Sequence, residues 1–292
     1  MAAGVRQKGC PMRTLIRMEL LKLRKRRMTW IMLGMLVGLR LAGTAFSVFW
    51  SSQAGVEPEI RERILASATL PNTIPDALNF IAGLGAFLLA ILTAASMGSE
   101  YSWGTLRAII GSGVPRSRFL AAKLIALSTA AVAYTVVPLV IVVGAAVPMA
   151  WLLDRPIMAS GIDGPWVGDV LLMMARTVLP LLAQVAMAFA ITVVTRSQAA
   201  GVGVALAATF VEPLAALVLD MLGGALAAIA DYLLLVNAQA LMQYNGFGTV
   251  QVPQGTLSQT HAVLVILGWM ALYVTTALLV FRRRDIEVRS AA

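Results

Sequence analysis

Six long apolar segments, separated by shorter polar stretches, constrain this chain more than any other feature. Each is about as long as the roughly 20 residues that an α-helix needs to cross the hydrocarbon core of a bilayer. The segments cover residues 29–50, 76–97, 120–151, 171–194, 199–219 and 262–281. Inside a bilayer, backbone N–H and C=O groups have to pair within their own segment, which favours helices. We therefore predict an all-α membrane protein with six transmembrane helices.

The composition agrees with this prediction. The chain has 292 residues, of which 59% are hydrophobic and 13% are charged, whereas globular domains carry roughly 25% charged residues. This predicts one transmembrane domain over residues 29–281 and excludes an arrangement of two soluble lobes. The net charge of +9 does not indicate a nucleic-acid partner, because the basic residues flank the apolar segments and so favour contact with membrane lipid.

The distribution of basic residues predicts the orientation. The N-terminal region, the loop 99–123, the turn 195–198 and the tail 282–292 together hold 18 of the 23 Lys and Arg. Because cytoplasmic loops carry an excess of Lys and Arg, we predict that both termini and the loop 99–123 lie in the cytoplasm. The long segment 220–260 would then lie outside, and its apolar part, 222–235, suits a short re-entrant or interfacial helix.

Residues 1–28 carry nine Lys or Arg and a single acid, Glu19. Within them, apolar residues repeat at helical spacing: Met12, Leu15, Ile16, Leu20 and Leu23. This pattern predicts a basic amphipathic helix in the membrane interface, with its apolar face in lipid and its cations toward anionic headgroups. Two interpretations stay open. The segment either only orients the first span, or it also braces a cytoplasmic partner.

The sequence lacks the motifs of an enzyme site. It contains no G-x-x-x-x-G-K-[ST] loop for a nucleotide phosphate, no H-E-x-x-H and no Cys/His cluster, since Cys10 and His261 are the only residues of their types. We therefore predict that this chain has no catalytic residues, metal site or cofactor of its own, and that any energy for its work comes from elsewhere.

The loop 99–123 is polar and strongly patterned. It begins with an acid, Glu100, and carries four bases, which are Arg107, Arg116, Arg118 and Lys123. We predict a short helix over 100–111, with Glu100 at its start, where a negative charge complements the helix dipole. An apolar face for packing would come from Tyr101, Trp103, Leu106, Ile109 and Ile110. An alternative is a tight turn whose aromatic residues only anchor it at the headgroups.

The order of residues in this loop resembles the permease subunits of ABC-2 type ABC transporters. The matching positions are Glu100, the step Gly104-Thr105-Leu106-Arg107, the turn Pro115, Ser117 and Arg118, and Lys123. Residues 18–23 (MELLKL) and 281–286 (FRRRDI) also look like the two ends of that family's chains. The spacing between Gly111 and Pro115 departs from the family pattern.

The resemblance implies a permease subunit of a bacterial plasma-membrane exporter. A separate ATPase subunit would bind ATP and Mg, and a second permease chain, identical or related, would complete the membrane part. The resemblance also implies which residues contact the ATPase: Glu100, Tyr101, Trp103, Gly104, Thr105, Leu106, Arg107 and Ile110. The transported molecule is not identified by the sequence.

Three ionisable residues are predicted at membrane depth: Arg40, Arg176 and Glu212. Each is costly when it faces lipid, so each is expected to face a partner, a cavity or water. One hypothesis pairs Glu212 with Arg40 or Arg176 along a translocation path. The alternatives are a purely structural ion pair or a span boundary placed wrongly, since Arg176 is near enough to the outside for its side chain to reach water. These residues also keep open an ion-gradient-driven secondary transporter. A membrane scaffold or sensor that recruits a protein through the loop 99–123 is a further alternative.

Overall fold

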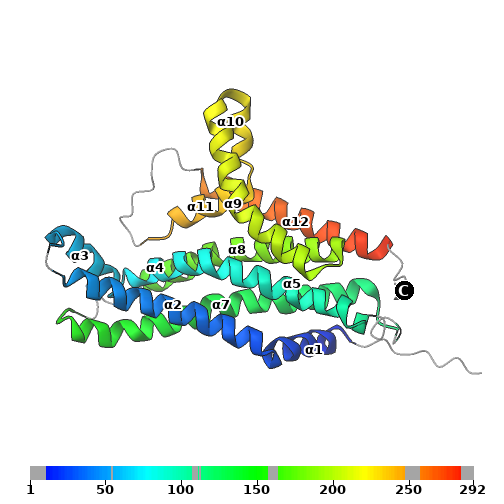
Figure 1. Cartoon of the computed structure of the whole chain (residues 1–292), viewed down its shortest axis with the longest axis horizontal. Helices are drawn as coiled ribbons and strands as arrows, with labels where there is room; N and C mark the ends of the chain where they lie inside the picture. Colours follow the sequence, from blue (N-terminus) through cyan, green and yellow to red (C-terminus); the bar gives the residue numbers. More distant parts are fainter. Residues whose placement is uncertain are drawn as a thin grey trace, which may run out of the picture.

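The computed structural model describes residues 11–53, 55–106, 111, 113–156, 164–246 and 257–283, and within them the regular structure is entirely helical (Figure 1). The helices are α1 (Met12–Lys25), α2 (Arg27–Ser51), α3 (Pro58–Ser67), α4 (Thr73–Phe80), the π-helix η1 (Ile81–Gly85), α5 (Ala86–Ser102), α7 (Arg116–Leu152), α8 (Gly164–Thr195), α9 (Gln198–Leu222), α10 (Gly224–Ala230), α11 (Leu234–Gln243) and α12 (Gln259–Arg283).

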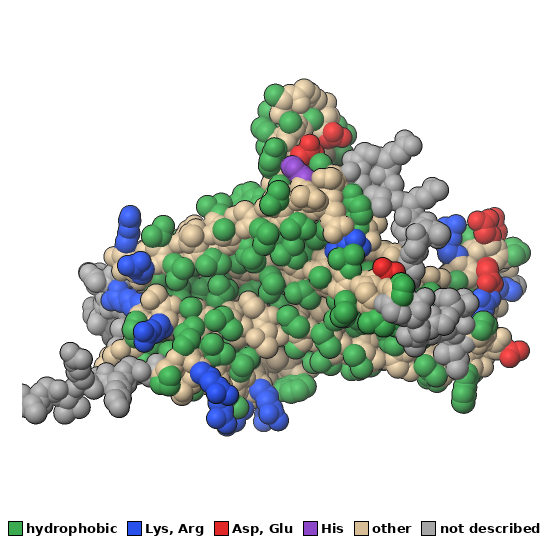
Figure 2. Space-filling view, turned by 180° about the vertical axis from the view of Figure 1, so that it is seen from behind, with side chains coloured by type: hydrophobic (Ala, Val, Ile, Leu, Met, Phe, Trp, Pro, Cys, Tyr) green, Lys and Arg blue, Asp and Glu red, His purple; other side chains and the backbone are tan. Residues whose placement is uncertain are grey.

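Six of these segments are long and apolar enough to cross a membrane, which confirms the predicted all-α class and the six candidate spans. They are α2, the continuous run α4–η1–α5, α7, α8, α9 and α12. The second of them is one helix with a π-helical insertion at Ile81–Gly85. Figure 2 shows that one broad face between the two ends of the molecule is largely hydrophobic, as expected for a surface in contact with lipid.

The core lies between α5, α7 and α8. Most of the apolar part of α5 and α8 is buried inside the chain, whereas little of α2, α9 and α12 is. Large side chains such as Phe119, Tyr134 and Phe189 fill the interior, and the Tyr134 hydroxyl donates to the Thr29 carbonyl at 2.7 Å, which joins α7 to the start of α2. The outer three helices therefore present most of their apolar surface outward.

Two glycines allow the closest helix approaches. A Cβ added at Gly98 of α5 would lie 2.5 Å from Cβ of Gln198, and one added at Gly201 of α9 would lie 2.0 Å from Oγ1 of Thr192. Small residues at such positions let membrane helices pack backbone to backbone. By contrast, Gly34 and Gly38 of α2 have open space around them, so neither serves a close helix contact in the described part of the chain.

Helix α7 is longer than a bilayer requires. Its 37 residues span about 55 Å at 1.5 Å per residue, against a hydrocarbon core of about 30 Å. Pro138 and Pro148 lie inside it without ending it. The basic first turns of α7 lie at the end of the molecule that holds α1 (Figure 1).

Helix α9 leaves the bundle. It begins where the Ser197 hydroxyl accepts a hydrogen bond from the Ala200 amide, and it ends at Gly223, whose φ of 68° suits glycine. The end of α9 and α10 stand clear of the other helices, and α11 bends back toward them (Figure 1). Helices α10 and α11 meet at 70° and together are apolar enough to form a broken span or a re-entrant loop. The predicted short helix over 222–235 is therefore divided, because the chain breaks between Ala230 and Leu234.

Helix α1 forms inside the predicted N-terminal segment, but its apolar face does not lie in lipid. Leu15 and Leu23 are buried in the protein core, and Met12, Ile16 and Leu20 pack against it, with α7 as the main neighbour. The exposed apolar residues of α1 are instead Met18 and Leu21. This corrects the prediction for the apolar face. Periodicity identifies an apolar face but not the surface that it meets.

Candidate functional site

Four charged side chains meet where α1 packs against α5 and α7, and each acid of the group pairs with both bases. The ammonium of Lys123 lies 2.7 Å from the Glu19 carboxylate and 3.0 Å from the Glu100 carboxylate. The ammonium of Lys22 lies 2.6 Å and 3.0 Å from the same two groups. We call these residues, Glu19, Lys22, Glu100 and Lys123, the inner charge cluster. It joins α1, the end of α5 and the start of α7.

Three members of the inner charge cluster are buried and Lys22 is half-buried, so the charges of the cluster have to balance one another. The side chain of Lys123 is 1% exposed and that of Glu100 is 4% exposed. A charge taken out of water is costly unless it is paired and hydrogen-bonded. Two carboxylates and two ammonium groups satisfy this requirement together, and the loss of any one of them leaves an unpaired charge inside the protein.

The sequence of α1 explains how Glu19 becomes buried. Glu19 stands four residues from both Leu15 and Leu23, so the three share one helix face, and that face packs against the core. Lys22 lies at the edge of the same face and is more exposed. Burial would lower the pKa of its ammonium, but hydrogen bonds and attraction from Glu19 and Glu100 outweigh this effect and raise the pKa. Its contribution to stability is therefore present at neutral pH and is lost only in strongly alkaline solution.

Glu100 does not begin a helix, contrary to the prediction. It lies in the last turn of α5, which ends at Ser102, where the negative end of the helix dipole disfavours a carboxylate. The two lysines of the inner charge cluster offset this disadvantage. The Thr105 hydroxyl also donates to the Glu100 carboxylate, which attaches the segment after α5 to the cluster.

The turn after α5 presents its aromatic residue outward. Trp103 is 74% exposed, and Gly104 follows with a φ of 66°, a left-handed conformation that reverses the chain. Leu106 is buried and packs into the core with the half-buried Tyr101. Of the residues predicted to contact an ATPase, Arg107 and Ile110 lie outside the described residues, as does Ile109.

Arg26, between α1 and α2, adds a second connection. Its guanidinium donates to the Ser99 hydroxyl at 2.6 Å and to the Ala95 carbonyl at 3.3 Å, and it lies 6.0 Å from the centre of the Trp103 ring. The linker between α1 and α2 is thereby fastened to the same end of α5 as the inner charge cluster.

The predicted pairing of Glu212 with Arg40 or Arg176 is wrong. Arg176 donates to the Tyr244 carbonyl at 2.6 Å and to the Gln259 side chain at 2.9 Å, which holds the end of α11 to the start of α12. Arg40 donates to the Thr44 hydroxyl one turn later on α2. Each arginine therefore has hydrogen-bond partners other than Glu212, and in the described part of the chain neither forms an ion pair.

Glu212 instead caps a helix. Its carboxylate accepts hydrogen bonds from the backbone amides of Leu235 and Val236 in the first turn of α11. The first amides of a helix have no partner within the helix, and a carboxylate at that position also complements the dipole. Glu212 thus fastens the start of α11 to α9, a role that no local sequence signal indicates because 23 residues separate the two.

The capping role predicts a local effect of substitution. Glu212→Ala should weaken α11 by about 0.5–2 kcal/mol, the range for losing a capping side chain, while the six spans stay folded. Hydrogen–deuterium exchange of residues 234–243 should become faster. Asp220→Asn, at an exposed acid of the same helix, is the control and should leave this exchange unchanged. Equal exchange in the Glu212→Ala variant and the unaltered chain would contradict the cap.

Three members of the inner charge cluster were singled out from the sequence, but no contact between them was predicted. Glu100 and Lys123 belong to the motif of the loop 99–123, and Glu19 is the one acid of the N-terminal segment. Two facts in the sequence point to the cluster: an acid on the apolar face of an amphipathic helix, and a lysine just inside a long apolar span. Neither identifies its partner. Lys22, Arg26 and Ser99 were not predicted to take part.

The site and fold together define an all-helical protein with six segments able to cross a membrane and a buried charge cluster at one end. No three His, Cys, Asp or Glu side chains lie close enough to hold a metal ion in the residues that the structure describes. Residues 66–287 match the family model described as a protein of unknown function, DUF2705. Because the match covers well over half of the chain, this protein belongs to that family. No curated protein matches the sequence.

Proposed function

We propose that this chain is the transmembrane permease subunit of an ATP-driven transporter, in which a separate ATPase subunit docks beside the exposed Trp103. The observation that carries the proposal is the inner charge cluster. It ties the end of α5, which leads into the proposed docking segment, to α1 and α7 through buried ion pairs. A surface that only sits in lipid has no need for such a rigid connection.

The connections define a route for mechanical coupling. A partner that moves the segment after α5 would pull on Glu100 through the Thr105 hydroxyl. Glu100 would carry the displacement to Lys123 of α7 and to Lys22 of α1. Arg26 would carry it to the start of α2. Because these contacts are short and at least partly buried, the ends of four helices, α1, α2, α5 and α7, would move as one body when ATP closes the ATPase.

The remaining parts of the proposal follow from charge and exposure. The end that holds α1 carries most of the Lys and Arg, so it would lie in the cytoplasm together with both termini. The basic outer face of α1 would contact anionic headgroups. The apolar faces of α2 and α9 remain largely exposed, and a second permease chain, identical or related, would cover part of them. The direction of transport, export across the bacterial plasma membrane, rests on the family resemblance alone.

Co-purification tests the proposal. When the tagged chain is taken from its native membrane in mild detergent, an ATPase of roughly 25–35 kDa, one or two soluble domains, should accompany it. Trp103→Ala should reduce the recovered ATPase by about tenfold or more, since an exposed tryptophan at an interface often contributes over 1.4 kcal/mol of binding free energy. The truncation removes an exposed side chain, so the chain should still fold.

Trp151→Ala is the matched control. Trp151 is also 74% exposed but lies at the opposite end of α7, and its truncation should leave the ATPase bound. Loss of the ATPase from both variants would indicate general instability, and absence of any ATPase from the unaltered chain would contradict the proposal.

The gradient-driven alternative would work through Glu212 and the membrane arginines. Because Glu212 accepts hydrogen bonds from the amides of α11 and Arg176 donates to Tyr244 and Gln259, the geometry favours a structural role for these two residues. The scaffold alternative shares the docking segment with our proposal. It predicts a bound partner that lacks ATPase activity, so the same purification separates the two.

A further inference from the structure

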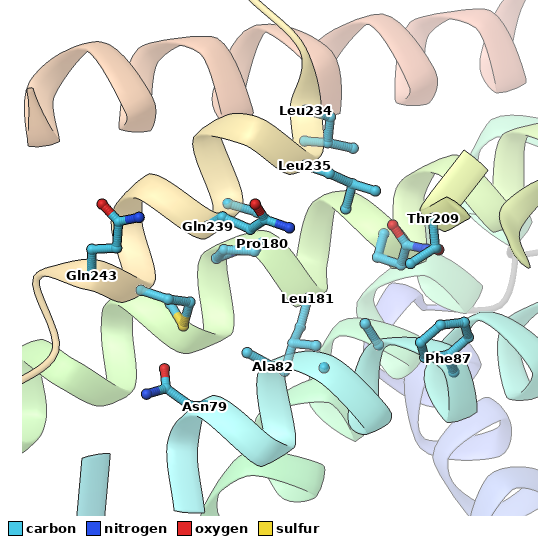
Figure 3. Close-up of a pocket in the computed structure, with 15 residues that line it drawn as sticks. Asn79, Ala82, Phe87, Pro180, Leu181, Thr209, Leu234, Leu235, Gln239 and Gln243 are labelled. Atoms are coloured by element: carbon cyan, nitrogen blue, oxygen red, sulfur yellow. The ribbon is translucent and has the colours of Figure 1, made fainter. Parts of the chain in front are cut away.

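A cavity of about 460 Å³ lies at membrane depth within this single chain (Figure 3). Residues of the second span, among them Asn79 and Phe87, form one side, and residues of α11, such as Leu235 and Gln239, form the other. Pro180 and Leu181 of α8 lie between them. The volume falls in the range of about 300–1,000 Å³ that small-molecule sites occupy.

The lining is mostly apolar, with a minority of polar groups and no charged ones. Five of the fifteen lining side chains carry an amide or hydroxyl group, and none of the fifteen carries a formal charge. Those five are Asn79, Gln184, Thr209, Gln239 and Gln243. The remaining positions are apolar or glycine. The membrane-depth residues Arg40, Arg176 and Glu212 do not line the cavity.

Two of the polar groups lack a partner in the described part of the chain. Gln184 donates to the Thr209 hydroxyl at 3.5 Å, but the amides of Asn79 and Gln239 have no hydrogen-bond partner there. Both residues are exposed rather than buried, so their amides are accessible to a bound molecule. These two side chains come from different sides of the cavity, Asn79 from the second span and Gln239 from α11 (Figure 3), so a molecule that fills the cavity can reach both.

The backbone supports the same conclusion. The π-helical insertion η1 (Ile81–Gly85) contributes Ala82 and Gly83 to the lining. Single-turn π-helical insertions often occur at functional sites. Gly83 has open space where a side chain would begin, which leaves the cavity unobstructed on that side. Phe87 packs against Phe210, with ring centres 5.7 Å apart, and closes one end.

We propose that this cavity binds an uncharged amphipathic molecule, whose hydrogen-bonding groups meet Asn79 and Gln239 and whose apolar part lies against Phe87, Leu181 and Leu235. A charged ligand would be desolvated here without a counter-charge. The assignment of this molecule as the transported substrate rests on the proposed permease function, whereas its binding does not.

A matched pair of lipid probes tests the chemical class. The purified chain is placed in phosphatidylcholine vesicles with a photoreactive diacylglycerol, or with the phosphatidic acid that carries the same acyl chains. Diacylglycerol should label residues 79–87 and 234–243 by mass spectrometry, and phosphatidic acid should label them at least tenfold less. Equal labelling by the two probes would overturn the proposal, because lipid would then fill the cavity without selection.

Substitutions test the site itself. Asn79→Leu/Gln239→Leu should reduce labelling by diacylglycerol about fivefold or more, because two hydrogen bonds are lost. Gly83→Leu should reduce it by filling the cavity. Asn72→Leu, one residue before α4 and outside the lining, is the control and should keep full labelling. Unchanged labelling in both cavity variants would overturn the proposal. No ATPase is present in these vesicles, so the result is independent of the co-purification test.

Discussion

Lys123→Met is expected to lower the free energy of unfolding by about 3–5 kcal/mol, the cost of removing one partner of a buried ion pair. The Glu19 and Glu100 carboxylates would remain inside the protein with only Lys22, the most exposed member of the inner charge cluster, to balance them. The midpoint of thermal unfolding in detergent, followed by size-exclusion chromatography after heating, should fall well below that of the unaltered chain.

A double variant tests whether the loss of stability comes from the unpaired charge or from the changed shape of the side chain. Glu19→Leu/Lys123→Met removes one acid and one base together and leaves Glu100 paired with Lys22 at 3.0 Å. Because apolar replacement of a complete buried pair is often neutral, the double variant should be more stable than Lys123→Met alone. Glu59→Gln, which breaks the exposed pair with Arg63, is the control and should have almost no effect. If Lys123→Met matched this control, the inner charge cluster would not hold the helices together.

Gly98→Ala is expected to destabilise the protein by about 1–3 kcal/mol, the usual range for overpacking. The added Cβ would lie 2.5 Å from Cβ and 2.9 Å from Cα of Gln198. Because one of these atoms belongs to the backbone, α5 and α9 have to separate. The unfolding midpoint should fall, and the start of α9 should exchange amide hydrogens faster, since Gln198 begins that helix.

Gly38→Ala is the matched control for this prediction. Gly38 also lies inside a helical span, but nothing approaches a Cβ built there. The same substitution should therefore leave stability unchanged or raise it slightly, as alanine favours helix over glycine. A similar loss of stability at Gly38 and Gly98 would mean that the approach to Gln198 does not determine the effect.

The cavity shows why some functional features do not appear in a sequence. Asn79 and Gln239 are separated by 160 positions and by most of the membrane spans. Each alone is an ordinary amide in an apolar helix. Only the return of α11 toward the bundle, held by Glu212 and Arg176, places the two on opposite sides of one space.

The linear sequence determined the six spans and the presence of a helix in the N-terminal segment. Those features depend on the length and spacing of apolar residues within one stretch, and a backbone in lipid has few alternatives to a helix. The tertiary structure alone decided that α1 packs on protein rather than lipid, that Glu100 ends a helix, and that Glu212 caps α11 instead of pairing with an arginine. Each of these depends on a partner far away in the chain, and local periodicity carries no information about which distant group will satisfy a buried charge.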